Sequence, residues 1–109
     1  MPEVVTPARG LVYWATLDGM RKPWLVVSNN ARNRALSTCL AVRITTSQKP
    51  QIATIIELGP QDAPLQGRVL CDDVAVMFPD DDGFEYLGAL TTGTMMRVDA
   101  GLRAALALR

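Results

Sequence analysis

The sequence predicts a mainly β fold with helices, in which a small, strongly bent sheet closes into a barrel and carries a C-terminal helix. Short segments rich in β-branched and aromatic residues recur along residues 10–88, separated by Gly, Pro, Asp and Asn. From Thr91 onward the apolar residues change to a spacing of three and four, which is typical of a helix. The chain has 109 residues, which favours one domain over residues 1–109.

Each expected strand has a local signal. The first, residues 10–17, ends at Asp18–Gly19, a pair that favours a tight turn. The second, residues 23–28, begins at Pro23, where a missing N–H matters least, and Asn residues then cap a helical turn over 30–35. The remaining strands are expected at residues 39–45, 52–58, 68–78 (in two parts, 68–71 and 74–78, with a bulge between them) and 84–88.

The C-terminal segment predicts one helix with a single apolar face. Thr91 is suited to cap its first turn, because a threonine hydroxyl accepts a hydrogen bond from a free backbone N–H. The apolar residues that repeat at helical spacing are Met95, Val98, Leu102, Ala105 and Leu106. Met95 and the adjacent Met96 are expected to pack in the core or against a second copy of the chain.

The composition excludes several classes of protein. No apolar run reaches about 18 residues and no basic stretch precedes an apolar one at the N-terminus, so we expect no membrane span, no signal peptide and a cytoplasmic location. The chain has no histidine, which removes the commonest metal ligand and the commonest acid–base group at neutral pH. Cys39 and Cys71 lie in apolar segments, which favours buried thiols over a disulfide or a metal pair.

The charges are unevenly distributed although the net charge is zero. Residues 1–54 contain seven basic and two acidic side chains, whereas residues 55–109 contain four basic and nine acidic ones. Such a chain is expected to present a cationic surface that attracts phosphates, unless folding interleaves the two halves and cancels the field. Arg21 and Lys22 precede the apolar run at 24–27, and Arg32 and Arg34 follow it. Both ends of this strand are therefore expected to contribute cations to one phosphate-binding surface.

Three motifs in order carry a resemblance to a known family. They are R-G-L-V-Y-W-A-T-L-D at 9–18, K-P-W-L-V-V-S-N-N at 22–30 and V-R-I-T-T-S at 42–47, with weaker echoes at 70–74 and 87–90. Together they cover nearly the whole chain, and they resemble the MazF/PemK family of toxin endoribonucleases, the mRNA interferases of type II toxin–antitoxin systems. The resemblance implies an SH3-like β-barrel (MazF/CcdB-like) that assembles as a homodimer.

The same resemblance implies an activity and partners. Members of the family cut single-stranded RNA at short sequences without a metal or another cofactor, leaving a 2′,3′-cyclic phosphate and a 5′-hydroxyl. A cognate MazE-like antitoxin neutralises the toxin by laying an acidic, largely disordered tail over the RNA groove. The family's catalytic pair is an arginine before the proline of the second strand and the first threonine that ends the third. Here those positions are Lys22 and Thr45.

RNA cleavage through its own 2′-hydroxyl requires a base, an acid and a cation that stabilises the charged phosphorane. An unperturbed lysine is protonated at pH 7. Arg21 and Arg43 are expected to favour the neutral form of Lys22 by like-charge repulsion, which would make it a proton-transfer group. Alternatively Lys22 stays charged and binds the phosphate with Arg21. The candidate catalytic residues are therefore Lys22, Thr45 and Arg21.

The expected RNA-contacting residues flank these positions. They are Arg43, Thr46, Ser47, Asn29, Asn30, Arg32, Arg34 and Asp72. Thr45 and Thr46 would face opposite sides of a continuing strand, so that one packs while the other offers its hydroxyl. Asn29, Asn30 and Asn33 suit caps and turns better than base reading, and Arg32 and Arg34 would track phosphates beside the groove. Trp24 suits the core better than base stacking, and one of the neighbouring Tyr13 and Trp14 is expected to be partly exposed.

No metal site is expected. Asp72 and Asp73 point to opposite faces of a strand and make a poor bidentate site, so Asp72 would instead orient a base or a cation across the dimer. Residues 80–82 are expected to form a solvated acidic loop.

Two other functions are consistent with a small barrel: a non-catalytic module that binds RNA or protein, and a gyrase poison of the same fold. The gyrase-poisoning relatives use a C-terminal Trp-Gly-Ile, whereas this chain ends in Ala107–Leu108–Arg109.

Overall fold

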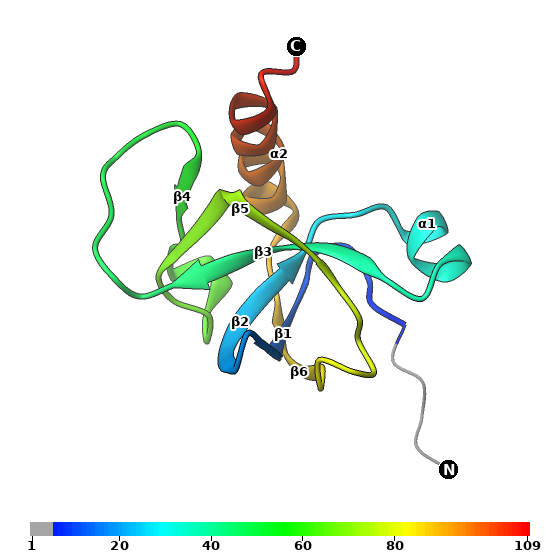
Figure 1. Ribbon diagram of the computed structural model, residues 1–109. Helices are drawn as coiled ribbons and strands as arrows, with labels where there is room; N and C mark the ends of the chain where they lie inside the picture. The colour runs from blue at the N-terminus through cyan, green and yellow to red at the C-terminus, as the bar shows by residue number, and fades with distance from the viewer. Residues whose placement is uncertain (1–5) are drawn as a thin grey trace.

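The computed structural model describes residues 6–109; residues 1–5, part of the N-terminal stretch inspected for a signal peptide, lie outside them. Six strands, two α-helices and one 3-10 turn follow one another within the described chain (Figure 1). They are β1 (Leu11–Leu17), β2 (Met20–Val26), α1 (Asn30–Ala35), β3 (Cys39–Thr45), β4 (Ile55–Glu57), η1 (Pro60–Asp62), β5 (Arg68–Met77), β6 (Glu85–Ala89) and α2 (Thr92–Leu106). No helix in this part of the chain is long and apolar enough to cross a bilayer.

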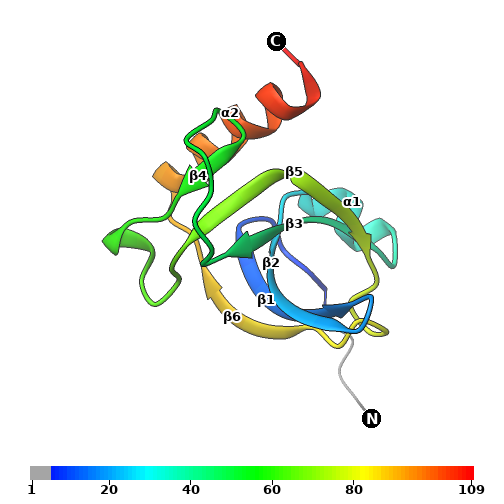
Figure 2. The ribbon, with the colours of Figure 1, turned by 60° about the vertical axis from the view of Figure 1, so that its left-hand side comes forward.

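The six strands form one antiparallel sheet in the order β4-β5-β3-β2-β1-β6. The sheet is strongly curved, so that β1, β2 and β6 wrap beneath β3 and β5 (Figure 2). The C-terminal helix α2 packs against β5 and β4 at one end of the sheet. The mainly β fold with a C-terminal helix that the sequence predicts is therefore confirmed.

Several predicted elements agree closely with the structure. The helical turn over 30–35 is α1 and the strand over 39–45 is β3. β5 is continuous from Arg68 to Met77 and contains the expected bulge, because its pairing with β3 shifts between Val42 and Arg43. The tight turn predicted after β1 occurs at Asp18–Gly19, where both residues have positive φ angles of 52° and 76°.

Two element predictions are wrong. β2 begins at Met20, so Pro23 lies inside the strand instead of at its start. The proline is tolerated there because β3 joins β2 only from Trp24 onward, which leaves β2 paired on one side at Pro23. The strand expected over 52–58 is reduced to Ile55–Glu57, because Ile55 N donates to Ile52 O (3.1 Å) and closes a turn before it.

Side chains from the two faces of the curved sheet form two apolar clusters. One is built around Val12, Leu25, Val42, Ile44, Val69 and Val98, and the other around Tyr13, Ala15, Trp24, Val26, Ala41 and Met77. Neighbouring residues of one strand alternate between the clusters, as the two-residue period of a strand requires. Trp24 is buried as expected, and of the adjacent aromatic pair Tyr13 is buried while Trp14 is 37% exposed.

A buried carboxylate fastens the start of α2 to the loop before β5. Asp62 is 1% exposed, and its two oxygens accept hydrogen bonds from Thr91 N (3.0 Å) and Thr94 Oγ1 (2.7 Å). The Thr91 hydroxyl accepts from Thr94 N (3.2 Å), which confirms the predicted cap. A negative charge at a helix N-terminus is stabilised by the helix dipole. The η1 loop and α2 are therefore held in a fixed relation.

The close packing of α2 on β5 yields the first testable prediction. A Cβ added to Gly101 would lie 2.7 Å from Cys71 Sγ and 3.3 Å from Ile56. We expect Gly101→Ala to lower the free energy of unfolding by roughly 1–3 kcal/mol, because overpacking outweighs the gain of about 1 kcal/mol in helix propensity. Gly93→Ala is the matched control on the same helix, where the added Cβ meets open space, and should raise it. Urea unfolding measures both; equal stabilisation by the two substitutions would contradict this packing.

The thiols give a second prediction. Cys39 and Cys71 are free and buried, as expected, and burial raises the pKa of each thiol to about 11. Both are therefore neutral at pH 8, and the neutral thiol is the unreactive form. In the folded protein we expect iodoacetamide to leave both unmodified over a period that alkylates them fully in guanidinium chloride. Mass spectrometry measures the extent, and fast labelling of the native protein would show that the segments around them open.

Candidate functional site

The pairing of β2 with β3 sets the geometry of the candidate site. Trp24 opposite Arg43 is the last registered pair of this ladder. In an antiparallel ladder each step back along one strand is matched by a step forward along the other. Lys22 lies two residues before Trp24 on β2, and Thr45 lies two residues after Arg43 on β3, so both follow the same end of the ladder. Because residues two apart share a face of a strand, and paired residues face the same side, Lys22, Arg43 and Thr45 point to the same side.

A pocket of about 270 Å³ opens where this ladder ends. Its lining contains six residues predicted from the sequence: Arg21, Lys22, Arg43, Thr45, Thr46 and Ser47. The other lining residues are Trp14, Pro23, Ile44 and Gln66. The structure thus brings the three candidate catalytic residues and three of the expected RNA-contacting residues into one cavity. The lining has three cations and no carboxylate.

Two of the three cations have no acidic partner among residues 6–109. Arg43 Nε is buried without a hydrogen-bond partner, and neither Arg43 nor Lys22 takes part in an ion pair. Arg21 differs, because its guanidinium donates to Glu85 Oε1 (3.1 Å) and to Gly83 O (3.0 Å). An unpaired buried charge is unfavourable until a counter-charge is supplied. The pocket is therefore suited to an anion.

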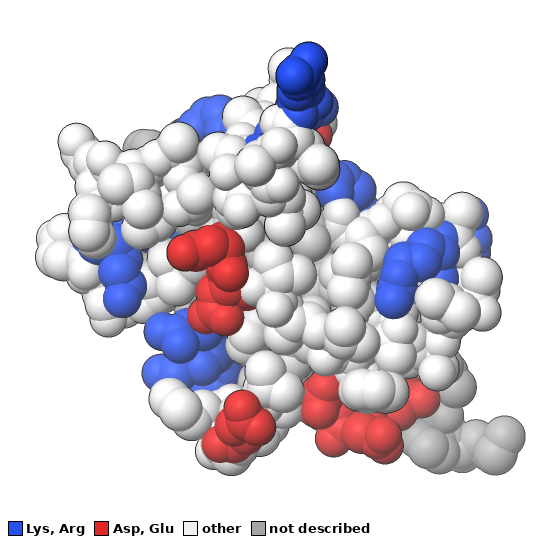
Figure 3. Space-filling view, turned by 45° about the horizontal axis from the view of Figure 1, so that its top comes forward, with Lys and Arg blue, Asp and Glu red and all other residues white. Residues whose placement is uncertain are grey.

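The positive potential is local and does not cover a whole face. Figure 3 shows basic side chains in separate clusters with acidic side chains between and below them. The two oppositely charged halves of the chain thus interleave on this surface. Of the two expectations from the sequence, interleaving therefore describes this face better than a continuous cationic surface. Lys22 and Arg43 of the pocket have no acidic partner among residues 6–109, and solvent screening is weaker in a cavity than on an open surface.

The Thr45 hydroxyl has one hydrogen-bond partner within the protein. Thr45 is 9% exposed, and its Oγ1 accepts a hydrogen bond from Ser47 N (3.2 Å). Since the oxygen accepts from the protein, the hydroxyl proton is available to donate to a ligand. β3 ends at Thr45, so the strand alternation does not continue, and both Thr45 and the exposed Thr46 line the pocket. Thr45 is buried and Thr46 is exposed, and which of the two hydroxyls meets a ligand stays a prediction.

The arrangement fits chemistry on a phosphate ester. Cations stabilise the charge of a phosphorane, and a positioned hydroxyl donates to its oxygens. Divalent metal ions prefer carboxylate ligands, and the lining side chains supply none. Within residues 6–109, no group of three or more His, Cys, Asp or Glu side chains is close enough to hold a metal ion.

Comparisons with known proteins place the chain in a family. Residues 8–106 match the family described as PemK-like, MazF-like toxin of type II toxin-antitoxin system. The chain belongs to this family. It is 44% identical over 102 residues to endoribonuclease MazF4 of Mycobacterium tuberculosis, with 94% of each chain covered. The family predicted from the sequence motifs is therefore confirmed.

Solved structures agree with this assignment. A mycobacterial endoribonuclease in complex with its cognate antitoxin superposes with a TM-score of 0.87 at 44% identity, covering 94% of this chain and 97% of that one. A MazE–MazF structure from Deinococcus radiodurans superposes with a TM-score of 0.82, covering 96% and 99% of the two chains. At 23% identity the second likeness concerns the fold alone.

Four predicted RNA-contacting residues of this MazF-like chain lie on or beside α1 and do not line the pocket. Asn29 caps α1 by accepting from Arg32 N (2.8 Å), and Asn30 Oδ1 accepts from Arg9 N (2.7 Å). The Arg32 guanidinium donates to Thr38 O (2.7 Å), which ties α1 to the start of β3. Arg34 is exposed and lines a separate hollow that also contains Asp80.

The remaining predicted residue, Asp72, is also absent from the pocket lining. It is exposed on β5 within the bulge, where residues 71–73 have no partner on β3. Asn33, interpreted as a turn residue, is buried and donates from Nδ2 to Ser28 O (3.0 Å). The polar residues that follow β2 thus build the connection to β3, and their contact with RNA stays a prediction.

The sequence interpretation missed two residues that matter for the pocket. Gln66 lies in the loop between η1 and β5, and no local pattern distinguishes it from other loop residues. Either Trp14 or Tyr13 was expected to be partly exposed, but the place of Trp14 in the pocket was not foreseen. Its partner across the β1–β2 ladder is Pro23, so the alternation along β1 together with the β1–β2 register would have indicated it.

Proposed function

We propose that this protein is an endoribonuclease toxin that cleaves single-stranded RNA, mRNA above all, at specific sequences without a metal, through attack of the RNA's own 2′-hydroxyl. The observation that carries the proposal is the pocket, whose lining contains three cations and two threonines and no carboxylate. Family membership and 44% identity to curated endoribonucleases support it. A target of mRNA places its action in the cytoplasm.

The 2′-oxygen gives its proton to a base, Lys22 or a water molecule, and attacks the adjacent phosphorus. The bond to the 5′-oxygen breaks, and that oxygen takes a proton from an acid, again Lys22 or a water molecule. The products are a 2′,3′-cyclic phosphate and a 5′-hydroxyl. Arg43 and Lys22 stabilise the additional negative charge of the phosphorane, and the Thr45 hydroxyl donates to one of its oxygens. The nucleophile belongs to the substrate, so no cysteine or serine of the protein forms a covalent intermediate.

Two partners follow from the same proposal. A cognate MazE-like antitoxin with an acidic, disordered tail would supply carboxylates to the unpaired cations of the pocket and exclude RNA. The mycobacterial relative at 44% identity is a complex of an endoribonuclease with its cognate antitoxin, which supports this partner. A homodimer would cover the outward-facing apolar side chains of β5, among them Val74 and Val76, which are 41% and 53% exposed.

The chemistry can be tested with a chelator and a modified substrate. We expect cleavage of a long RNA of little structure to persist in EDTA, because the pocket stabilises charge with side chains alone. The 5′ and 3′ ends of the fragments, mapped by sequencing and mass spectrometry, should carry a hydroxyl and a cyclic phosphate. A 2′-deoxy substitution at the mapped cut site should abolish cutting there. Cleavage of that substrate would contradict the 2′-hydroxyl route, and binding without any cutting would favour a non-catalytic barrel.

The role of Lys22 can be tested by substitution. We expect Lys22→Ala to lower kcat/KM by at least about 100-fold, because it removes the positive charge that stabilises the reacting phosphate. Arg32→Ala should lose far less, and Arg103→Ala, which removes an exposed cation from α2, is the matched control. Comparable small losses for Lys22→Ala and Arg103→Ala would refute the assignment.

Lys22→Arg then separates the two roles left open by the sequence. Arginine keeps the positive charge but does not give up its proton in proteins. Retained activity would make Lys22 a phosphate-binding cation, and lost activity in a folded variant would make it a proton-transfer group. The kcat and KM of the folded variant on the mapped substrate provide the measurement.

A further inference from the structure

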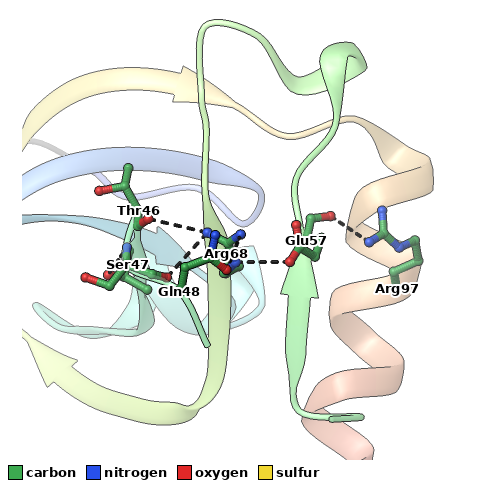
Figure 4. Close-up of polar contacts among 7 residues, drawn as sticks. Thr46, Ser47, Gln48, Glu57, Arg68 and Arg97 are labelled. Carbon is green, nitrogen blue, oxygen red and sulfur yellow. Dashed lines mark hydrogen bonds and ion pairs between the residues drawn. The ribbon is translucent and has the colours of Figure 1, made fainter. Parts of the chain in front are cut away.

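Arg68, a residue outside the pocket lining, contacts the backbone of the segment that lines it. Arg68 begins β5 and pairs with Thr45 on one side and with Glu57 of β4 on the other. Its guanidinium donates from Nη1 to the carbonyl oxygens of Thr46 (3.4 Å) and Ser47 (3.3 Å) and from Nη2 to Gln48 Oε1 (3.3 Å). Figure 4 shows these contacts meeting at one side chain between β4 and the segment that follows β3.

The guanidinium is itself fixed by an acid. Arg68 Nε donates to Glu57 Oε1 (3.0 Å), and the arginine side chain is only 14% exposed. All three nitrogens are therefore used within the protein, and the side chain is not free to reach a ligand. The Glu57 carbonyl in turn accepts from Arg97 Nη2 (2.6 Å), which connects β4 to α2 (Figure 4). Arg68 is therefore held by β4, which is itself connected to α2, while it binds the segment that follows β3.

The preceding residue strengthens the same contact. Gly67 has a φ of +106°, and a Cβ there would lie 2.2 Å from the carbonyl oxygen of Thr45. Only glycine permits this approach, because no side chain fits between the two backbones. Gly67 O also accepts from Leu58 N (2.9 Å), so its position is held from β4 as well. Gly67 and Arg68 thus support residues 45–48 through contacts made by residues outside the pocket lining.

The segment has few other restraints. β3 ends at Thr45, and the strand ladder offers the carbonyls of Thr46 and Ser47 no partner. Thr46, Ser47 and Gln48 are exposed, so packing does not hold them either. Arginine is suited to this task because its planar fork presents several donors in fixed directions, whereas a lysine ammonium is a single point of charge.

We propose that Arg68 is a positioning residue for the reaction, holding the segment 45–48 so that Thr45, Thr46 and Ser47 line the pocket. The inference rests on the proposed function in that the pocket is the place of cleavage. In this role Arg68 does not touch the substrate and transfers no proton in the reaction. Its loss lets the segment move, and misplacement of a reacting group by about 1 Å lowers the rate by up to about 100-fold. Glu57 holds the Arg68 guanidinium, so substitution of Glu57 is expected to lower the rate in the same way but by a smaller factor.

Three variants test the proposal. Arg68→Lys keeps the charge and stem, Arg68→Ala removes both, and Arg103→Lys is the matched control on an exposed face of α2. Backbone amide spectra of each variant, labelled with ¹⁵N and without RNA, report the position of Thr46 and Ser47. kcat and KM are measured with a quenched fluorescent RNA that the wild-type protein cuts. Thermal unfolding checks that each variant is folded at the assay temperature.

For Arg68→Lys we expect shifted or broadened amide signals confined to residues 45–48 and the neighbourhood of Glu57. We expect kcat to fall roughly 10- to 100-fold while KM changes by less than about threefold, since binding by Lys22 and Arg43 is retained. A general loss of stability would not produce this split at a temperature where the variant is folded. If Arg68→Ala does not fold, Arg68→Lys and Glu57→Gln carry the test.

Two results would overturn the proposal: unchanged amides at Thr46 and Ser47 together with kcat within about twofold of wild type, or a raised KM with unchanged kcat, which would make Arg68 a binding group. Failure of the proposed function looks different. In that case the wild-type protein itself cuts no RNA, and the amide spectra still decide whether Arg68 positions the segment.

Discussion

The register between β2 and β3 is the constraint on which the site depends. Leu25 and Val42 face each other across this ladder and are fully buried, so the register is fixed by the core. A slip by one residue would turn every side chain of a strand to its other face. Lys22 and Thr45, which face the same side at the end of the ladder, would then be separated. The same apolar contacts that stabilise the sheet therefore also assemble the cationic pocket.

Much of this arrangement is readable from the sequence, and the failures have physical causes. Strand and helix periods predict the elements, and the order of the family motifs indicates Lys22 and Thr45. Asn29 caps α1, the role that the sequence favoured, but a capping asparagine looks the same in sequence as one that reads a base, so the sequence alone does not separate the two roles. Gln66 and Arg68 could not be found, since their neighbours 45–48 are brought near only by the register and bulge of β5.

The connection between β4 and β5 links the helix to the site. At its start, buried Asp62 holds the first turn of α2, and at its end Gly67 and Arg68 support the segment that follows β3. Gln66 between them reaches the pocket lining. A stretch with little regular secondary structure thus holds α2 and the segment after β3 in fixed positions, through specific hydrogen bonds and one close backbone contact. These contacts restrict which residues can occupy both ends of the stretch.

The uncompensated guanidinium of Arg43 has a thermodynamic consequence for the toxin as a whole. Like charges that line one pocket repel one another, so the pocket favours an anionic occupant. A partner that binds only the folded chain adds its own binding free energy to the stability of the fold. The protein is then most durable when it is inhibited and most fragile when it is free to act.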